Sequence, residues 1–229
     1  MTKIMTALLT IENLPDLNET ITVPEDIFEE LTAQDASVAG FNPYEQPTVR
    51  DLLYGVLLPS GADACETLAR AVGGSEEGFV AMMNQKAEEL GLTNTHFENC
   101  TGLHNDNHYS TCRDIAVLMS ECLKSDTFRE IVTREVYTTE ATASHPEGIT
   151  LYDTMLHRFT SYEMSTTLEN GAVIEGGKTG FTDEAGQCLV SFAEYGGEEY
   201  ILVTAEAMTD SGSAVDSIAD ASTVYGRLQ

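Results

Sequence analysis

The sequence is poor in basic residues. Of its 229 residues, 11 are lysine or arginine and 38 are aspartate or glutamate, giving a formal net charge of -27. A surface with this charge repels phosphate backbones and anionic lipid headgroups, so we expect neither nucleic acid nor an anionic membrane as a partner. The simplest interpretation of the acidity is a solvated face that keeps the protein soluble.

Long apolar runs and metal-binding cysteine patterns are also missing. No stretch of about 18 apolar residues occurs, so the sequence predicts no membrane-spanning segment, and it shows no secretory signal pattern. The cysteines are odd in number and never form a C-x-x-C pair, which argues against a metal site. We expect most of them to be small buried hydrophobic residues. They are Cys65, Cys100, Cys112, Cys122 and Cys188.

The apolar residues that are present follow a helical period in the first half of the chain. With 42% hydrophobic residues, the chain can bury one substantial core. The segment from about 16 to 46 is polar and rich in turn residues, and we predict no helix there. A capping-box pattern at Thr48 and a Ser75 cap mark two helix starts. Helices are predicted over 1–11, 48–57, 62–71, 79–90 and 111–122.

The period then changes to that of β-strands. Segments 135–141 and 148–154 flank a His-Pro turn and predict a hairpin. Strands are predicted over 172–180, 187–194 and 200–208, the last two joined by a tight Gly196-Gly197 turn. A helix over 213–225 follows. This order predicts an α+β fold in one domain covering residues 1–229.

Three short motifs could carry chemistry. Lys3 begins an apolar helix, Ser60 lies in a Pro-Ser-Gly turn between two helices, and Lys178 lies in a Gly-Lys-Thr-Gly strand. Each is weak alone, because such short patterns arise by chance. The chain has only two other lysines, Lys86 and Lys124. In so lysine-poor a sequence, two lysines at motif positions favour function over a solvated surface.

Together these motifs resemble S-x-x-K, S-x-N and K-T-G of the penicillin-binding acyl-transferases. The blocks "TVRDLLYGVLLPSGADA", "LGLTNTHFENCTGLHNDNHYSTCRDIAVLM" and "IEGGKTGFTDEAGQCLVS" are similar to the low-molecular-weight D-alanyl-D-alanine carboxypeptidases, the peptidase S11 family. The resemblance covers essentially the whole chain. It implies a penicillin-binding/β-lactamase-like transpeptidase fold, with a helical lobe and an antiparallel sheet covered by helices.

The resemblance implies a serine-type D-Ala-D-Ala carboxypeptidase that acts on peptidoglycan stem peptides through an acyl-serine. β-Lactam antibiotics would acylate the same serine. No metal or organic cofactor is implied, and the full-length protein would work outside the cytoplasm, at the cell envelope.

Residue roles follow from the same resemblance. Lys3 would take the serine proton, with its pKa lowered by burial and by Lys178 as a second cation. Ser60 would relay the proton to the leaving D-alanine nitrogen. Lys178 and Thr179 would bind the terminal carboxylate. Gly180 leaves room for the substrate backbone, and the N–H of Phe181 would join the oxyanion hole.

Two departures from the family pattern are visible. The S-x-x-K serine would stand immediately before Met1, so we expect an N-terminally truncated domain without the nucleophile, inactive as a fragment. Ala62 replaces the usual Asn of S-x-N and removes donors there. The truncation would also take away strands that pair with segment 200–208. This predicts either pairing of that edge between chains, as in an edge-strand homodimer, or lowered stability.

Two other functions stay open. A non-catalytic module that binds wall peptides would explain Ala62 and the missing serine. A β-lactamase is the third interpretation, disfavoured because no Glu-x-x-x-Asn deacylation segment is found. His104, His108 and Tyr109 lie in the "GLHNDNHYST" segment. We interpret it as a loop bonded to the helix that starts near Thr111, in preference to a lining of the substrate groove.

Overall fold

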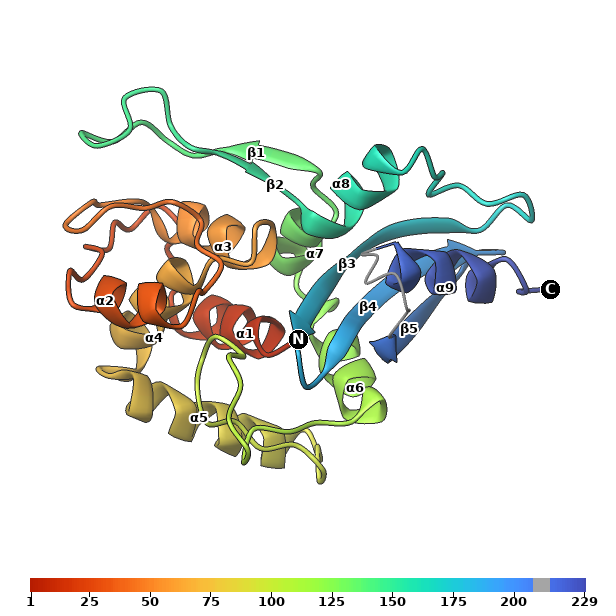
Figure 1. The fold of residues 1–229 in the computed structure, drawn as a ribbon, viewed down its shortest axis with the longest axis horizontal. Coiled ribbons are helices and arrows are strands. Elements are labelled where there is room, and N and C mark those ends of the chain that lie inside the picture. Colours follow the sequence, from red (N-terminus) through yellow and green to blue (C-terminus); the bar gives the residue numbers. More distant parts are fainter. Residues whose placement is uncertain (208–214) are drawn as a thin grey trace.

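The computed structural model describes residues 1–207 and 215–229, and it divides them between two lobes (Figure 1). A helical lobe lies on one side, and a three-stranded sheet with flanking helices lies on the other. The helices are α1 Lys3–Asn13, α2 Ile27–Ala33, α3 Val49–Leu57, α4 Ala62–Gly73, α5 Glu76–Glu89, α6 Cys112–Cys122, α7 Asp126–Val132, α8 Thr154–Ser161 and α9 Asp216–Tyr225.

Helix α1 is the centre of the helical lobe, and it contacts α3, α4, α5, α6 and α7. Every residue from Lys3 to Thr10 is buried. A helix surrounded on all sides needs partners for its polar groups. The hydroxyl of Thr6 donates to the carbonyl of Cys100 at 2.7 Å, and that of Thr10 donates to the Thr6 carbonyl at 2.8 Å.

The predicted helix starts are confirmed by their caps. Thr48 and Asp51 form a complete capping box at α3, and the Ser75 hydroxyl accepts the Gly78 N–H at α5. At α6 the Thr111 hydroxyl accepts the N–H of Asp114. Each cap satisfies amide groups that have no partner within the helix.

Strands β3 Val173–Thr182, β4 Gly186–Tyr195 and β5 Glu198–Ala207 form an antiparallel sheet in that order. Gly196 and Gly197 have φ of 65° and 85°, the left-handed conformation that a two-residue hairpin turn requires. Strands β1 Val136–Thr138 and β2 Thr150–Tyr152 form the separate predicted hairpin.

The sheet separates two apolar cores. Alternate side chains of β4 point to opposite faces, so Leu189 and Ala193 join one core while Val190 and Phe192 join the other. Helices α8 and α9 contribute to the first core, and the helical lobe contributes to the second. The predicted α+β fold is confirmed.

Three short helices were not predicted from the sequence. In α2 only Ile27 and Leu31 are buried, so its apolar pattern spans a single helical turn. The expectation of no helix between residues 16 and 46 is therefore wrong. Helix α7 follows a Ser125 cap, and α8 follows an Asp153 cap where we expected the strand to continue to 154. The expected boundaries Met208 and Ser213 lie outside the described residues.

Candidate active site

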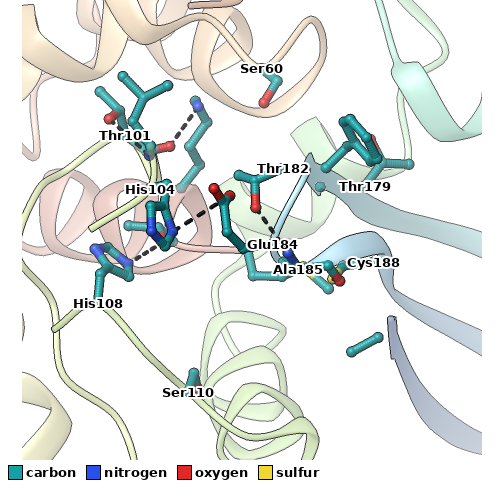
Figure 2. A pocket seen from close by; sticks show the side chains of 18 of the residues that line it. Ser60, Thr101, His104, His108, Ser110, Thr179, Thr182, Glu184, Ala185 and Cys188 are labelled. Atoms are coloured by element: carbon teal, nitrogen blue, oxygen red, sulfur yellow. Dashed lines mark hydrogen bonds and ion pairs between the residues drawn. The ribbon is translucent and has the colours of Figure 1, made fainter. Parts of the chain in front are cut away.

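A pocket of about 720 Å³ opens where the two lobes meet (Figure 2). Its walls come from the start of α1, the turn before α4, the loop that precedes α6, the first turns of α8 and one end of the sheet. Five of the predicted site residues line it: Lys3, Ser60, Thr179, Gly180 and Phe181. The sixth, Lys178, is buried directly beside them.

The two motif lysines are both buried. The Lys3 Nζ donates to the carbonyl of Thr101 at 2.7 Å. Lys178 is only 1% exposed, and its Nζ donates to the Thr179 carbonyl at 3.1 Å. Burial, reinforced by the neighbouring Lys3 ammonium, lowers the pKa of Lys178 to about 7, while Asp153 opposes this shift. The two cations therefore act on the same site.

The other two lysines lie in surface ion pairs. Lys86 contacts Glu12 at 2.8 Å and Glu89 at 3.4 Å, and Lys124 contacts Glu121 at 2.5 Å. Exposed pairs of this kind contribute little to stability. The contrast in burial separates the motif lysines from the surface ones.

Ser60 is held in a left-handed turn, with φ of 67°. Its side chain faces the pocket (Figure 2). Two backbone hydrogen bonds hold the residues that follow Ser60. The Gly61 N–H donates to the Gly55 carbonyl at 2.8 Å, and the Ala62 N–H donates to the Ser37 carbonyl at 2.7 Å. A strained backbone conformation that the surroundings enforce is typical of functional sites.

The carboxylate of Asp63 fixes the same turn against a neighbouring loop. It accepts backbone N–H groups from Ala39, Gly40 and Phe41 at 2.7, 3.0 and 3.1 Å. Asp63 is fully buried, so these three bonds replace the water it has lost. The loop and the Ser60 turn therefore form one rigid unit.

Two glycines of β3 lie in different surroundings, Gly177 in a tightly packed region and Gly180 at the pocket. A Cβ on Gly177 would lie 2.4 Å from the Val190 carbonyl oxygen and 2.8 Å from the Met155 sulfur. A Cβ on Gly180 would meet only Met1 and Cys188, at 3.3 Å or more. Gly177 therefore serves packing, whereas Gly180 borders the pocket.

The loop with His104, His108 and Tyr109 lines the pocket in addition to leading into α6. His108 Nδ1 accepts the Glu98 N–H at 3.2 Å, which leaves Nε2–H to donate to Thr2 Oγ1 at 2.8 Å. Burial lowers the pKa of His108 to about 4, so the ring is neutral at physiological pH.

The same loop reaches across the pocket to the sheet. His104 Nδ1 lies 3.5 Å from Glu184 Oε2, in the turn between β3 and β4 (Figure 2). The contact joins the two lobes at the mouth. Sequence spacing could not indicate it, because the partners are far apart in the chain.

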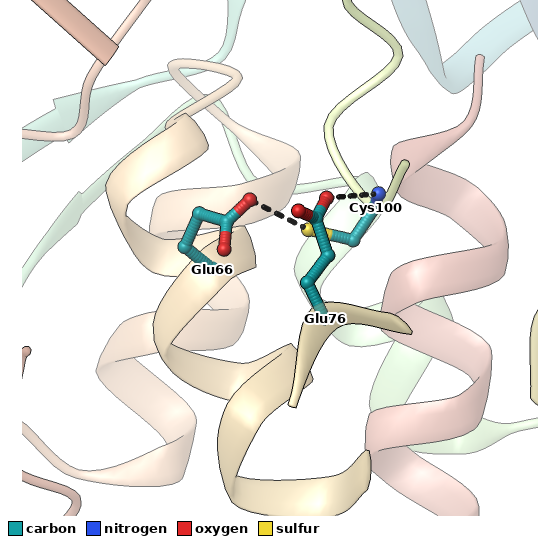
Figure 3. Close-up of side chains that lie close together, drawn as sticks. All are labelled: Glu66, Glu76 and Cys100. Atoms are coloured by element: carbon teal, nitrogen blue, oxygen red, sulfur yellow. Dashed lines mark hydrogen bonds between the residues drawn. The ribbon is translucent and has the colours of Figure 1, made fainter. Parts of the chain in front are cut away.

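Three further side chains of types that can bind metals lie close together (Figure 3). The ligand atoms of Glu66, Glu76 and Cys100 lie within 4.8 Å of one another. Cys100 Sγ donates to Glu66 at 3.4 Å, and its N–H donates to Glu76 at 3.1 Å. Burial, followed by the charge of Glu76, raises the pKa of Glu66 to about 7. The cluster holds the main chain next to Thr101, the Lys3 acceptor.

The cysteines otherwise match the prediction. Four are buried and Cys112 is exposed, and all five are free thiols. None of the helices formed by residues 1–207 and 215–229 has both the length and the apolar character needed to span a membrane.

Known proteins are similar to this chain in sequence and in fold. The chain is 35% identical over 210 residues to D-alanyl-D-alanine carboxypeptidase DacF of Bacillus subtilis, covering 91% of this chain and 51% of that protein. It is 36% identical over 208 residues to a D-alanyl-D-alanine carboxypeptidase of Streptomyces sp. strain K15, covering 87% of this chain and 69% of the relative. The chain thus spans about half the length of the Bacillus relative.

Solved structures agree with the sequence matches. The crystal structure of the Streptomyces K15 DD-transpeptidase superimposes with a TM-score of 0.81 at 32% identity, covering 98% of this chain and 85% of that one. A D-alanyl-D-alanine carboxypeptidase from Mycobacterium tuberculosis gives a TM-score of 0.78 at 26% identity, covering 98% and 79%. The peptidase S11 family, described as D-alanyl-D-alanine carboxypeptidase, matches residues 1–209. The chain therefore belongs to the peptidase S11 family of D-alanyl-D-alanine carboxypeptidases.

Proposed function

We propose that this pocket belongs to a D-Ala-D-Ala carboxypeptidase of peptidoglycan stem peptides, working at the cell envelope through an acyl-serine. The observation that carries the proposal is the meeting of Lys3, Ser60 and the Lys178–Gly180 strand around one cavity. A lysine beside a serine can act as the base that activates the hydroxyl for acyl transfer.

Each residue then has a role. Lys3 accepts the proton of the S-x-x-K serine, and Ser60 passes a proton to the leaving D-alanine nitrogen. Lys178 and Thr179 bind the carboxylate of the substrate. The N–H of Phe181 stabilises the oxyanion, while Gly180 leaves space for the peptide backbone. β-Lactams are cleaved by the same serine and remain attached to it as an acyl group.

The S-x-x-K pattern places its serine three positions before Lys3, immediately ahead of Met1. We propose that a polypeptide beginning at Met1 binds peptides without forming an acyl-enzyme. The test compares this chain with one that has a single added serine before Met1, and with one that has an added alanine. Labelled penicillin should mark only the serine form, and that form should release D-alanine. An adduct on Ser60 of the original chain would contradict these roles.

A peptide-binding module without catalysis is the alternative, favoured by Ala62 at the third position of the S-x-N motif. It predicts that the added serine leaves penicillin labelling and D-alanine release undetectable while the peptide still binds. Rapid hydrolysis of a chromogenic β-lactam by the serine form would instead indicate a β-lactamase.

A second copy of the chain is proposed as a partner at the sheet edge. Within residues 1–207 and 215–229, strand β5 pairs with β4 alone, which leaves its outer edge unpaired by any strand. Such an edge can pair with another chain. Sedimentation of the purified chain should show a dimer that Leu202→Pro disrupts, because Leu202 lies within β5. A monomer at all concentrations would contradict this.

A further inference from the structure

We propose that Glu66, Glu76 and Cys100 bind a divalent metal ion of the zinc type. None of the three lines the active-site pocket, so this is a separate site. The inference does not depend on the proposed enzymatic activity, because it concerns metal binding by the chain as it stands.

The three side chains point toward one another from separate elements (Figure 3). Glu66 comes from α4, Glu76 is the first residue of α5, and Cys100 lies in the loop before α6. Their ligand atoms all lie within 4.8 Å of one another. Zinc binds sulfur at about 2.3 Å and carboxylate oxygen at about 2.1 Å, so a tetrahedral site separates these two atoms by about 3.6 Å. The distance from Cys100 Sγ to Glu66 Oε1 is 3.4 Å, which requires only small side-chain movements.

The Glu66 carboxylate has no hydrogen-bonding partner outside this cluster in the part of the chain that the structure describes. Glu66 is nevertheless only 8% exposed. Arg70 Nε lies 3.7 Å from Glu66 Oε2, which is too far for a hydrogen bond, and the Arg70 guanidinium donates instead to Asp26 at 2.7 Å. A buried carboxylate without donors is stabilised when it coordinates a metal ion.

The charges of the cluster also favour a cation. Two carboxylates that lie close together away from water repel each other strongly. A divalent ion between them would neutralise both Glu66 and Glu76. The Cys100 N–H donates to Glu76 Oε1 at 3.1 Å, which keeps this carboxylate beside the thiol.

A second cavity, of about 230 Å³, gives the ion a route to the cluster. Glu66 and Glu76 line this cavity, whereas Cys100 is fully buried. The thiolate ligand favours zinc over magnesium and calcium, which prefer oxygen ligands. When the ion binds, the thiol proton and any proton shared by the two carboxylates pass to solvent. The cavity leaves room for water as the fourth ligand.

The bound ion would also fix the main chain that holds Lys3. The Cys100 carbonyl accepts from the Thr6 hydroxyl at 2.7 Å, and the next carbonyl, that of Thr101, accepts from Lys3 Nζ at 2.7 Å. Both carbonyls adjoin the metal ligand Cys100. The metal site therefore supports the position of the motif lysine without touching the active-site pocket.

Titrations of the purified chain with zinc and with cobalt test the site. Co²⁺ can replace Zn²⁺, and it absorbs in the near ultraviolet when a thiolate binds it. The wild-type chain should bind one equivalent of either ion and show this absorption. Cys100→Ser should abolish the absorption and weaken zinc binding at least about a hundredfold, since even residues that only support a ligand contribute about 10–100-fold. Glu76→Gln should weaken zinc binding at least about tenfold.

Cys112→Ser is the matched control, because Cys112 is the exposed thiol, and it should leave both measurements unchanged. Circular dichroism checks the folding of each variant, and Glu66→Gln gives a second ligand change should Cys100→Ser fail to fold. The proposal is overturned if the wild-type chain shows no saturable binding. It is also overturned if the cobalt absorption is lost in Cys112→Ser and kept in Cys100→Ser, or if Glu66→Gln and Glu76→Gln both bind zinc as the wild type does.

Discussion

The ammonium of Lys3 lies 2.7 Å from the main-chain carbonyl of Thr101, so a loop positions the first motif lysine. The preceding residue of that loop, Cys100, is held by Glu66 and Glu76 through its thiol and N–H. Thr6, one turn after Lys3, donates to the Cys100 carbonyl. The position of Lys3 in the pocket therefore depends on Thr6, Glu66 and Glu76, which do not line the pocket themselves.

Replacing Lys178 by methionine should change how stability depends on pH. The folded-state pKa of Lys178 is about 7, below the unfolded value of 10.5. Between these values the unfolded state binds the proton and the folded state does not, so stability rises with pH. The variant should lose this rise, by roughly 1–3 kcal/mol between pH 6.5 and 9.

Urea unfolding at the two pH values measures the effect, with Lys124→Met as the exposed control. The missing cation also raises the pKa of Asp153 further, which changes the slope in the same direction. Parallel pH dependence in the variant and wild type would show that the Lys178 ammonium is not destabilised by burial.

Glu66→Gln should stabilise the protein at high pH. The pKa of Glu66 is about 7 in the folded state, above its ordinary value of 4.5. The folded state therefore holds a proton that the unfolded state releases between these values, and stability falls as pH rises through this window. Glutamine can still accept from Cys100 without a charge. The variant should gain about 1–3 kcal/mol at pH 8 and little at pH 5.

Thermal unfolding at both pH values checks this, with Glu121→Gln as the control. The same measurement with added zinc tests the metal-binding geometry of the cluster. A zinc-dependent rise in the melting temperature that Glu66→Gln removes would show that the three side chains bind a metal.

Asp63→Ala should weaken both folding and peptide binding. The change leaves the N–H groups of Ala39, Gly40 and Phe41 without their acceptor. We expect a loss of about 2–4 kcal/mol in the free energy of unfolding, because several buried donors are affected. Asp220→Ala, on the surface of α9, is the control. Wild-type stability in the Asp63 variant would mean that the loop carries no stabilising role.

Two glycines of the K-T-G strand should respond differently to alanine. Gly177→Ala places a Cβ 2.4 Å from the Val190 carbonyl oxygen and should destabilise the fold by about 1–3 kcal/mol. Gly180→Ala meets nothing closer than 3.3 Å and should fold normally while weakening peptide binding. Melting curves and NMR titrations separate the two effects. Equal destabilisation by both would contradict the division between packing and pocket.

Much of the fold could be predicted because local signals agreed with tertiary structure. The Thr48 capping box and the Gly196-Gly197 turn define α3 and the β4–β5 hairpin without any long-range information. Helix α2 could not be predicted, because it buries only two residues. The positions of the motif residues followed from family resemblance, since Lys3 and Lys178 meet only after the lobes have assembled.

The rest of the pocket had no local signature. Thr154 lies where we predicted the end of a strand, and Arg158 lies in a segment for which we predicted no helix or strand, yet both belong to α8. His104 approaches Glu184 from another part of the chain. Such contacts depend on how the lobes pack, and neither periodicity nor composition encodes that packing in a single sequence.

The left-handed backbone of Ser60 has an evolutionary consequence. Glycine adopts φ of 67° without the steric cost of a Cβ, which is about 1 kcal/mol. Under selection for resistance to heat or proteases alone, a population of variants should replace this serine with glycine. When cells carrying Ser60 compete with cells carrying Ser60→Gly, the advantage of the serine form would then measure how strongly the organism depends on the Ser60 hydroxyl.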